Sequence, residues 1–342
     1  IFSGFDHAGY LPPAWDNNFD GRISSTIGNP VYLAGYLVLL IPPTLAIYFG
    51  AKANSKRAAF SIAALAAQIF ALAATFSRSG WAVCAVTAAA FMALAFAYGA
   101  VAQAKLAVRR MLHIVLITLI AVVAFSFPNP LNTSRFSVAQ RVTGFSVRND
   151  DSFKERFLIW KSTVEMIKEH PLRGVGLANF TPAYPVYQKK FYSDKEWLKH
   201  ISFPTRAHND PLEMWAETGA VGFILFLWLL AAVMRPGIRK PSFVRSRADA
   251  GTGLLIAGFS CGLAAVFMYS MFQFPMHVEG TVAHFWVFAG LLAAVSAAGV
   301  ERRGVEFRVF AGARRDSLPE AILIALLLAV AFLFVAGAAL VA

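Results

Sequence analysis

The chain has 342 residues, of which 58% are hydrophobic and only 15% are charged. Ordinary soluble domains carry about 25% charged residues, so this composition excludes a typical soluble domain and favours a helical protein that crosses a membrane several times. The net charge of +12 would suggest nucleic acid in a soluble protein. Here about half of the positive charge lies in short clusters between apolar runs, which the orientation rule for membrane proteins explains more simply. We expect no nucleic-acid partner.

Eight apolar runs follow one another along the chain, each close to the roughly 20 residues that span a bilayer as a helix. We therefore predict an all-α integral membrane protein with about eight transmembrane helices. Pro42-Pro43 lies inside the first run and predicts a kink or break there. The chain begins at Ile1 rather than at a methionine, and we expect further helices upstream of it. The eight runs cover residues 31–50, 58–76, 82–101, 111–127, 214–234, 252–272, 281–300 and 319–342.

Basic residues are concentrated in four of the connections between these runs. The four connections hold sixteen Lys and Arg residues and lie on one side under strict alternation, namely 51–57, 102–110, 235–250 and 301–317. Short basic connections stay in the cytoplasm, so the other connections face outward, including one too long for the charge rule. The predicted organisation is an outer segment over 1–30, helices one to four over 31–127, a large outer loop over 128–213, and helices five to eight over 214–342.

The outer loop contains a predicted amphipathic helix that Pro171 ends. Ser152 and Glu155 form a capping box at its start. Its apolar residues recur at helical spacing, so this helix could lie on the membrane surface or against the spans. Gly174 and Gly176 then permit a tight turn. The apolar positions are Phe153, Phe157, Trp160, Val164 and Ile167.

An aromatic and basic segment, NFTPAYPVYQKKFY, follows at residues 179–192. Aromatic faces stack on sugar rings, so this segment could contact a glycan. Tyrosines near a bilayer are more often interfacial anchors, and we favour that interpretation.

Residues 205–219, TRAHNDPLEMWAETG, place polar residues directly before an apolar run. Asp210 is a good helix N-cap, Pro211 fits the first turn, and Glu213 completes a capping box. His208 and Asn209 would then precede a helix N-terminus on the outer face, where free amides and partial positive charge suit anions such as diphosphates. The same positive end disfavours the imidazolium form, which keeps His208 neutral and able to accept a proton.

Four arginines are predicted on the same outer side, and we expect them to converge at one membrane surface. Guanidinium groups bind phosphate bidentately and stay charged when partly buried. For any single arginine, contact with lipid headgroups is the alternative. This alternative is weaker for Arg78, because it is an isolated cation between the second and third apolar runs. The four residues are Arg22, Arg78, Arg156 and Arg206.

The remaining histidines and the two cysteines are assigned smaller roles. His277 is a candidate secondary polar contact in the site, and His284 is expected to pack or hydrogen-bond between helices. His170 is expected at a helix end, and His200 is expected to be a solvated loop residue. Cys84 and Cys261 lie within apolar runs and show no metal-binding or disulfide spacing.

Several motifs occur in a characteristic order along residues 20–300. They are RISSTIGNPVYLAGYL, TFSRSGW, RFLIWKSTVEMIKEHPLRGVGLANF, AHNDPLEMWAETGAVG and, near the end, FPMH followed by HFWVFAGLL. Together they resemble the bacterial O-antigen ligase and O-antigen polymerase family, which includes related protein O-oligosaccharyltransferases. One departure is Asp210-Pro211, where many members carry an aromatic or small residue.

The resemblance implies a function as well as a fold. It implies many membrane helices with one large periplasmic loop in the bacterial inner membrane. The implied reaction moves a glycan from undecaprenyl diphosphate to an acceptor hydroxyl with inversion, and without a metal or a cofactor. The acceptor would be the lipid A-core, another glycan or a protein, and membrane lipids would surround the chain.

The resemblance also implies roles for individual residues. His208 matches the proposed catalytic base of the family's His-Asn motif, with Asn209 as the residue that orients it. Arg78 and Arg156 match arginines expected to hold the lipid diphosphate, and Arg22 and Arg206 are further candidates for that role.

The acceptor class separates three activities, which are ligase, polymerase and protein oligosaccharyltransferase, and the helix pattern does not choose among them. A transporter of lipid-linked glycans or a scaffold for envelope assembly is the alternative of another class. Transporters usually keep ionisable groups near mid-membrane, whereas the apolar runs of this chain carry no Asp, Glu, Lys or Arg deep inside them.

Overall fold

The computed structural model describes residues 22–97, 104–129, 132, 137–143, 151–238 and 250–301. Among these residues the secondary structure is helical, with a single isolated bridge between Asn129 and Asn132. Seven helices are long and apolar enough to cross a membrane, which confirms an all-α membrane protein. They are α2 (Pro30–Gly50), α3 (Lys56–Ala74), α4 (Arg78–Ala97), α5 (Ala104–Ala124), α9 (Asp210–Ile238), α10 (Ala250–Ser270) and α11 (Glu279–Glu301). The eighth expected helix, over 319–342, lies outside the described residues, as does most of the expected segment 1–30.

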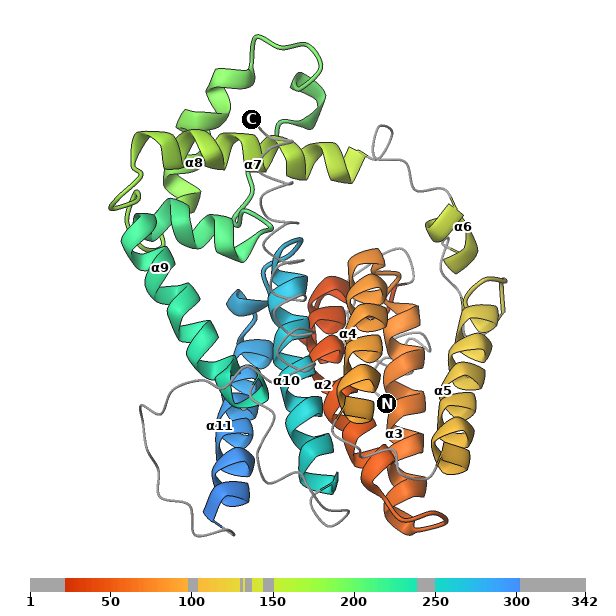
Figure 1. Ribbon diagram of the computed structural model, residues 1–342. Helices are drawn as coiled ribbons and strands as arrows, with labels where there is room; N and C mark the ends of the chain where they lie inside the picture. The colour runs from red at the N-terminus through yellow and green to blue at the C-terminus, as the bar shows by residue number, and fades with distance from the viewer. Residues whose placement is uncertain are drawn as a thin grey trace. The chain divides into compact units, whose positions relative to one another are not determined.

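The described residues form two compact units (Figure 1). The first unit comprises those up to Thr143, together with Val233–Val266 and those from Glu279 onward. The second comprises those within 144–232, together with Phe267–Val278. The first unit therefore contains α2 to α5, and the second contains most of the expected outer loop and the first part of α9.

Helix α2 is largely buried, as is α10, and packs against α3, α4 and α11. It runs without interruption through Pro42-Pro43, so of the expected kink or break the break is wrong. Pro43 has no N–H to donate to the carbonyl of Leu39. Gly258 and Gly262 of α10 approach this stretch so closely that a β-carbon on Gly262 would lie 2.6 Å from the Leu39 oxygen. Small residues at helix interfaces in membranes permit such close backbone approach.

The basic run 102–110, expected as a connection, largely belongs to α5, because this helix begins at Ala104. Arg110 is only 4% exposed and donates hydrogen bonds to the carbonyls of Phe49 and Ala51, at the C-terminal end of α2. Its guanidinium also lies 5.2 Å from the ring centroid of Tyr48. A cation at these carbonyls satisfies acceptors that the helix itself leaves unpaired.

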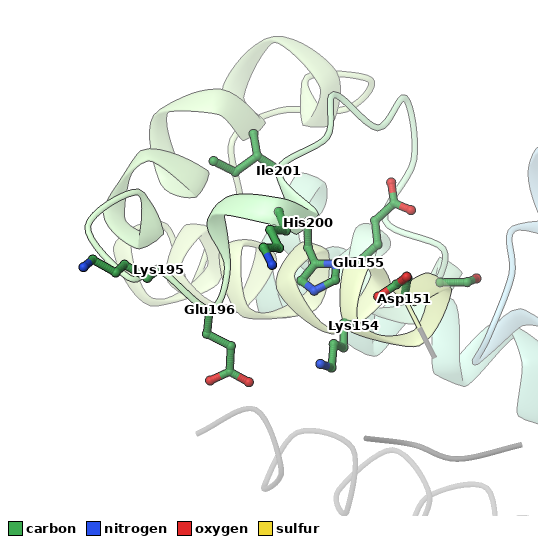
Figure 2. A pocket seen from close by; sticks show the side chains of 9 residues that line it. Asp151, Lys154, Glu155, Lys195, Glu196, His200 and Ile201 are labelled. Atoms are coloured by element: carbon green, nitrogen blue, oxygen red, sulfur yellow. The ribbon is translucent and has the colours of Figure 1, made fainter. Parts of the chain in front are cut away.

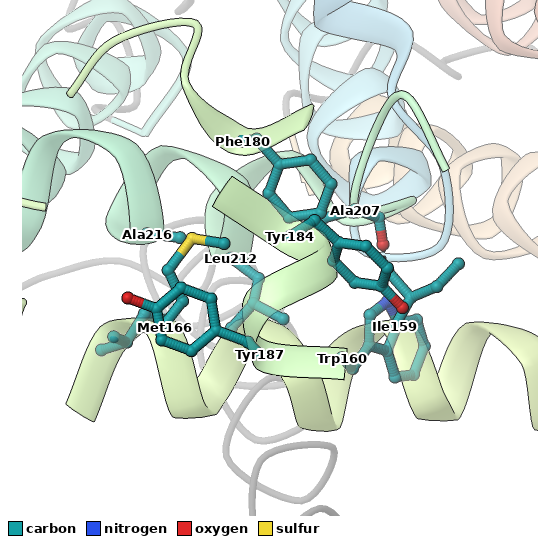
Figure 3. Packing of buried hydrophobic residues seen from close by; sticks show 10 residues of the cluster. Ile159, Trp160, Met166, Phe180, Tyr184, Tyr187, Ala207, Leu212 and Ala216 are labelled. Atoms are coloured by element: carbon teal, nitrogen blue, oxygen red, sulfur yellow. Dashed lines mark hydrogen bonds between the residues drawn. The ribbon is translucent and has the colours of Figure 1, made fainter. Parts of the chain in front are cut away.

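The second unit has a core of its own, built by α7 (Asp151–Glu169), α8 (Phe180–Gln188) and the first turns of α9 (Figure 3). The apolar face of α7 packs on this core, which confirms the amphipathic pattern and places it against protein. Phe180, Tyr184 and Tyr187 are also buried here, so their expected place as interfacial anchors or a sugar platform is wrong. Ser152 lies inside α7, and the expected capping box does not start this helix.

Two glycine positions shape the connection between α7 and α9. Gly174 and Gly176 have φ values of 66° and 102°, which confirms the expected turn. Helix α9 was expected to be continuous, but Gly219 interrupts it with φ 68° and ψ −174°. The first part of α9 therefore belongs structurally to the core of the second unit.

Candidate functional site

The N-terminus of α9 is capped by Asn209, one residue earlier than expected. The Asn209 side-chain oxygen accepts a hydrogen bond from the backbone N–H of Leu212 at 3.0 Å, and its backbone oxygen accepts from Glu213 at 3.0 Å. The Asn209 side-chain nitrogen donates to the carbonyl of Met271 at 3.1 Å. Both ends of this amide are therefore used to hold backbone, so Asn209 positions the chain beside His208 rather than bonding the imidazole.

The two carboxylates expected to cap α9 instead hold neighbouring segments. Asp210 accepts hydrogen bonds from the backbone N–H of Met276 at 3.0 Å and from His277 Nδ1 at 2.9 Å. Glu213 accepts from the backbone N–H of Ala207 at 2.6 Å. Asp210 is 4% exposed and Glu213 is fully buried, so these contacts replace the water that each carboxylate loses.

Arg206 and His277 complete an ionic cluster around these acids. Arg206 donates to Glu213 at 2.9 Å, and His277 Nε2 lies 3.5 Å from the same carboxylate. Burial lowers the pKa of His277, but the hydrogen bond to Asp210 and the charges of Asp210 and Glu213 outweigh it, so the pKa lies above its usual value. His277 therefore belongs to a network that favours its protonated form and joins the segment before α9 to residues 275–277.

His208 has an unusual backbone conformation, with φ 53°. Positive φ is uncommon for residues other than glycine, and such strain persists only where the surroundings enforce it. The preceding residue, Ala207, is held at its N–H by Glu213 and at its carbonyl by Trp160 Nε1, 3.0 Å away. The following residue, Asn209, is the helix cap. His208 is thus clamped on both sides, and its side chain is presented in a fixed direction.

The imidazole of His208 lies among groups that keep it neutral. Its burial, followed by the nearby charge of Arg156, lowers its pKa to about 4. His208 Nδ1 lies 3.4 Å from Gln273 Oε1, and the ring packs edge-on against Phe274 with 4.9 Å between centroids. In the tautomer that suits this contact, Nδ1–H donates to Gln273 and Nε2 keeps its lone pair.

Arg156 and Gln273 belong to two segments of this site that are far apart in the sequence. Arg156, on α7, donates to the carbonyl of Phe272 at 3.4 Å, so residues 272–274 contact both the cation and the histidine. Gln273 is only 3% exposed, and sequence reasoning missed it. A polar glutamine between the apolar end of α10 and the FPMH motif was the available signal.

Arg22 and Arg78, the other two arginines expected at the site, lie in the first unit. Arg22 Nε donates to the carbonyl of Thr75 at 2.8 Å, at the C-terminal end of α3. Arg78 is the first residue of α4, and Ser77 caps this helix by accepting from the N–H of Gly80. The structure therefore brings Arg22 close to the turn that carries Arg78, while His208, Arg156, Arg206 and His277 belong to the second unit.

The sequence of this region also matches a known protein family. Residues 62–227, which include Arg78, Arg156 and His208, match the family described as O-antigen ligase. This part of the chain is similar to O-antigen ligase domains. The match confirms the resemblance drawn from the motifs, and with the seven apolar helices it identifies a multi-pass membrane protein.

The similarity to one curated relative covers more residues than the matched O-antigen ligase segment. The chain is 22% identical over 250 residues to an uncharacterized protein of Haemophilus influenzae, covering 70% of this chain and 58% of the relative. The chain therefore spans a little more than half the length of that relative. Arg22, Gln273 and His277 lie outside the matched O-antigen ligase segment.

Three further histidines lie apart from His208. His170 is exposed directly after α7. His284 Nε2 lies 3.4 Å from the hydroxyl of Tyr36, which confirms an expected contact between helices. His200, expected to be solvated, is half-buried, and its ring lies 6.4 Å from that of Trp197.

His200 also borders an open cleft of about 670 Å³ between the first turn of α7 and the 195–201 segment (Figure 2). Three acidic and three basic side chains line the cleft, so it presents hydrogen-bond donors and acceptors without a dominant charge. Its lining residues are Asp151, Ser152, Lys154, Glu155, Lys195, Glu196, Lys199, His200 and Ile201.

Proposed function

We propose that the chain is an inverting glycosyltransferase, which moves a glycan from undecaprenyl diphosphate to an acceptor hydroxyl at the periplasmic face of the bacterial inner membrane. The observation that carries this proposal is the state of His208. This imidazole is held by a strained backbone at φ 53°, has a pKa lowered to about 4, and lies beside the cation of Arg156. A base that is neutral at physiological pH, next to a fixed positive charge, suits attack on an anionic donor.

The proposed reaction is a single displacement at the anomeric carbon. The acceptor oxygen forms a bond to C1 of the donor sugar while the bond from C1 to the diphosphate oxygen breaks. His208 Nε2 takes the proton of the acceptor hydroxyl, and the bonding electron pair leaves with the diphosphate. Attack on the face opposite the leaving group inverts the anomeric centre.

Arg156 would stabilise the negative charge that develops on the leaving diphosphate. We assign the same role to Arg78, because it begins α4 and its cation adds to the positive end of that helix. Arg22 would support this group from the neighbouring turn. Arg206 already pairs with Glu213 at 2.9 Å, and we assign it to the ionic cluster instead.

Gln273 and Asn209 are positioning residues in this scheme. Gln273 selects the tautomer in which Nε2 of His208 is free to accept a proton. Asn209 ties the start of α9 to Met271, two residues before Gln273. The two amides together keep the His208 imidazole aligned with the side chain of Gln273.

The test is transfer by the full chain, purified and reconstituted in liposomes that contain an undecaprenyl diphosphate-linked glycan. Parallel reactions offer a lipid A-core acceptor, a second lipid-linked glycan, and a protein with exposed serine and threonine residues. Product with one acceptor distinguishes ligase, polymerase and protein oligosaccharyltransferase activity.

In the same reactions, His208→Ala should reduce transfer by about 10²- to 10⁴-fold, the usual contribution of a general base. His170→Ala, which replaces an exposed histidine after α7, should transfer at the parent rate. Transfer at the parent rate by the His208 variant would remove the catalytic assignment.

A distance measurement tests whether Arg78 lies close enough to His208 to act on the same donor molecule. Spin labels at positions 78 and 208 in the reconstituted protein should report a separation compatible with one diphosphate-linked sugar. A separation beyond about 15 Å would place Arg78 outside direct cooperation with His208, and the donor site would then rest on Arg156 alone.

A further inference from the structure

The turn after α7 is locked onto the interrupted part of α9 by three backbone hydrogen bonds. The N–H groups of Val175 and Gly176 donate to the carbonyls of Ala216 and Glu217, each at 2.9 Å. The N–H of Ala220 donates to the carbonyl of Pro171 at 2.8 Å. Residues 171–177, called the interlock turn below, are therefore a fixed attachment to α9 rather than a free loop.

Glycine is required on both sides of this attachment. A β-carbon on Gly174 would lie 2.3 Å from the carbonyl oxygen of Glu217, and one on Gly219 would lie 2.2 Å from the carbonyl oxygen of Leu172. Both residues also have positive φ. The two backbones therefore meet at a spacing that no other residue allows.

The attachment lies where α9 changes character. Before Gly219 the helix carries Asp210, Glu213 and Glu217, all of them buried in the second unit. After Gly219 it is apolar as far as Arg235 and exposes large side chains, including Val221 at 61%, Ile224 at 62% and Trp228 at 68%. In a membrane protein, this change of character marks the level at which the helix enters the hydrocarbon.

The interlock turn exposes large apolar side chains at that same level. Leu172 is 67% exposed and Leu177 is 73% exposed, although the backbone beside each of them is fixed to α9. Arg173, between them, is also exposed, and a long cationic side chain at this depth can reach the lipid headgroups. A rigid turn that presents leucines and an arginine has the composition of an interfacial membrane anchor.

We propose that the interlock turn inserts Leu172 and Leu177 into the interfacial layer of the bilayer, beside the point where α9 enters it. The lipid surface is favoured over another protein segment, because the turn is hydrogen-bonded to α9 at Ala220, directly before the exposed apolar surface that begins at Val221. The anchor sets the depth of the first part of α9 and hence the height of His208 above the membrane. It depends on the chain spanning a membrane and not on the glycan transfer proposed above.

The test uses the full chain in liposomes of phosphatidylcholine with about one fifth phosphatidylglycerol, in the range of anionic content that attracts basic segments. Leu177→Cys and Leu172→Cys are labelled with an environment-sensitive fluorophore, and Lys199→Cys is the control, since Lys199 is exposed in the same unit. The parent protein, with Cys84 and Cys261, is labelled in parallel as the blank. Quenching is measured with doxyl-labelled lipid and with aqueous iodide.

Labels at 172 and 177 should be quenched by shallow doxyl lipid at least about twofold more than the label at 199, and by iodide correspondingly less. Quenching by iodide equal to that of the control would show that the turn faces water. Protection from both quenchers would show that another protein segment covers it. Either of these results overturns the proposal. Amide hydrogen exchange of residues 171–177 in nanodiscs, compared with detergent micelles, gives a second reading that needs no substitution, and equal exchange in both would also count against lipid contact.

Discussion

Two histidines at the start of α9 lie in opposite electrostatic surroundings. His208 faces the cation of Arg156 and a neutral amide, and burial with that cation lowers its pKa to about 4. His277 faces Asp210 and Glu213, which raise its pKa. Both rings lie near the same helix N-terminus, yet the pKa of His208 is lowered and that of His277 is raised. Burial and the nearest charged side chains shift these two pKa values in opposite directions, although both histidines lie beside the same helix end.

The two surroundings also separate two tasks. The cluster of His277, Asp210, Glu213 and Arg206 uses every charge in an ion pair or hydrogen bond, which suits holding segments together. His208 keeps one ring nitrogen with a lone pair, which suits proton transfer. Asn209 connects the two regions, since it follows His208 in sequence and precedes Asp210.

The largest expected difference between the two histidines is in catalysis. His208→Asn should lower kcat by about 10²- to 10⁴-fold, whereas His277→Asn should lower it by about tenfold or less, because only His208 is placed to exchange a proton with substrate. Steady-state kinetics of reconstituted protein with saturating donor measures both. Equal losses of kcat in the two variants would contradict separate roles for the two histidines, since both residues would then act as one unit.

The ionic cluster should dominate stability. Glu213→Ala leaves Arg206 and His277 without their shared carboxylate, and breaking such a buried pair costs about 3 kcal/mol. The matched control is Glu165→Ala, which removes exposed ion pairs to Lys168 and Lys190 and should cost less than about 1 kcal/mol. Thermal unfolding in detergent, followed by tryptophan fluorescence, ranks the two variants. A similar melting temperature for both would mean that the cluster contributes little to folding.

The two histidines should give stability opposite dependences on pH. His208 has a folded pKa below its unfolded value, so its contribution is present above about pH 6.5 and is lost as pH falls toward 4, by up to about 3 kcal/mol. His277 has a raised folded pKa, so its contribution is present below about pH 6.5 and is lost as pH rises through the folded value.

Unfolding midpoints between pH 4 and pH 9 test these signs. His208→Asn should flatten the acid side of the profile, and His277→Asn should flatten the neutral to alkaline side. An unchanged acid side in the His208 variant would show that its imidazole is not held neutral by the fold.

The smallest expected effect comes from Gln273, which positions the His208 ring. Gln273→Ala should lower kcat about tenfold with little change in KM, since it releases the ring without touching substrate. Gln273→Glu places an anion beside His208, so it should move the acid limb of the kcat/KM profile to higher pH than in the parent. Gln68→Ala, which removes a half-buried amide from α3, is the control. If the acid limb of the Gln273→Glu profile does not move, then residue 273 does not influence the pKa of His208.

Much of the fold follows from local pattern. Apolar runs near 20 residues predicted the seven membrane helices of the described part, because a bilayer requires that length and composition. The spacing of Phe157, Trp160 and Val164 predicted the amphipathic helix, and Gly174 and Gly176 predicted a turn. These properties depend on residues close together in sequence, so the sequence is sufficient to identify them.

Other features depend on contacts between distant segments and were missed or misjudged. Asn209 rather than Asp210 caps α9, because Asp210 is drawn to Met276 and His277. Gly219 interrupts α9 because Leu172 lies against it. In both cases the local pattern was compatible with the expectation, and a partner more than forty residues away in sequence decided otherwise.

The sequence by itself determined the class of protein, the family resemblance and the candidacy of His208, because composition and ordered motifs are properties of the chain. The opposite pKa shifts of the two histidines follow from the three-dimensional fold. A pKa depends on burial and on charges within a few ångströms, and the charged neighbours that matter here, Arg156 for His208 and Asp210 for His277, lie more than fifty residues away in sequence.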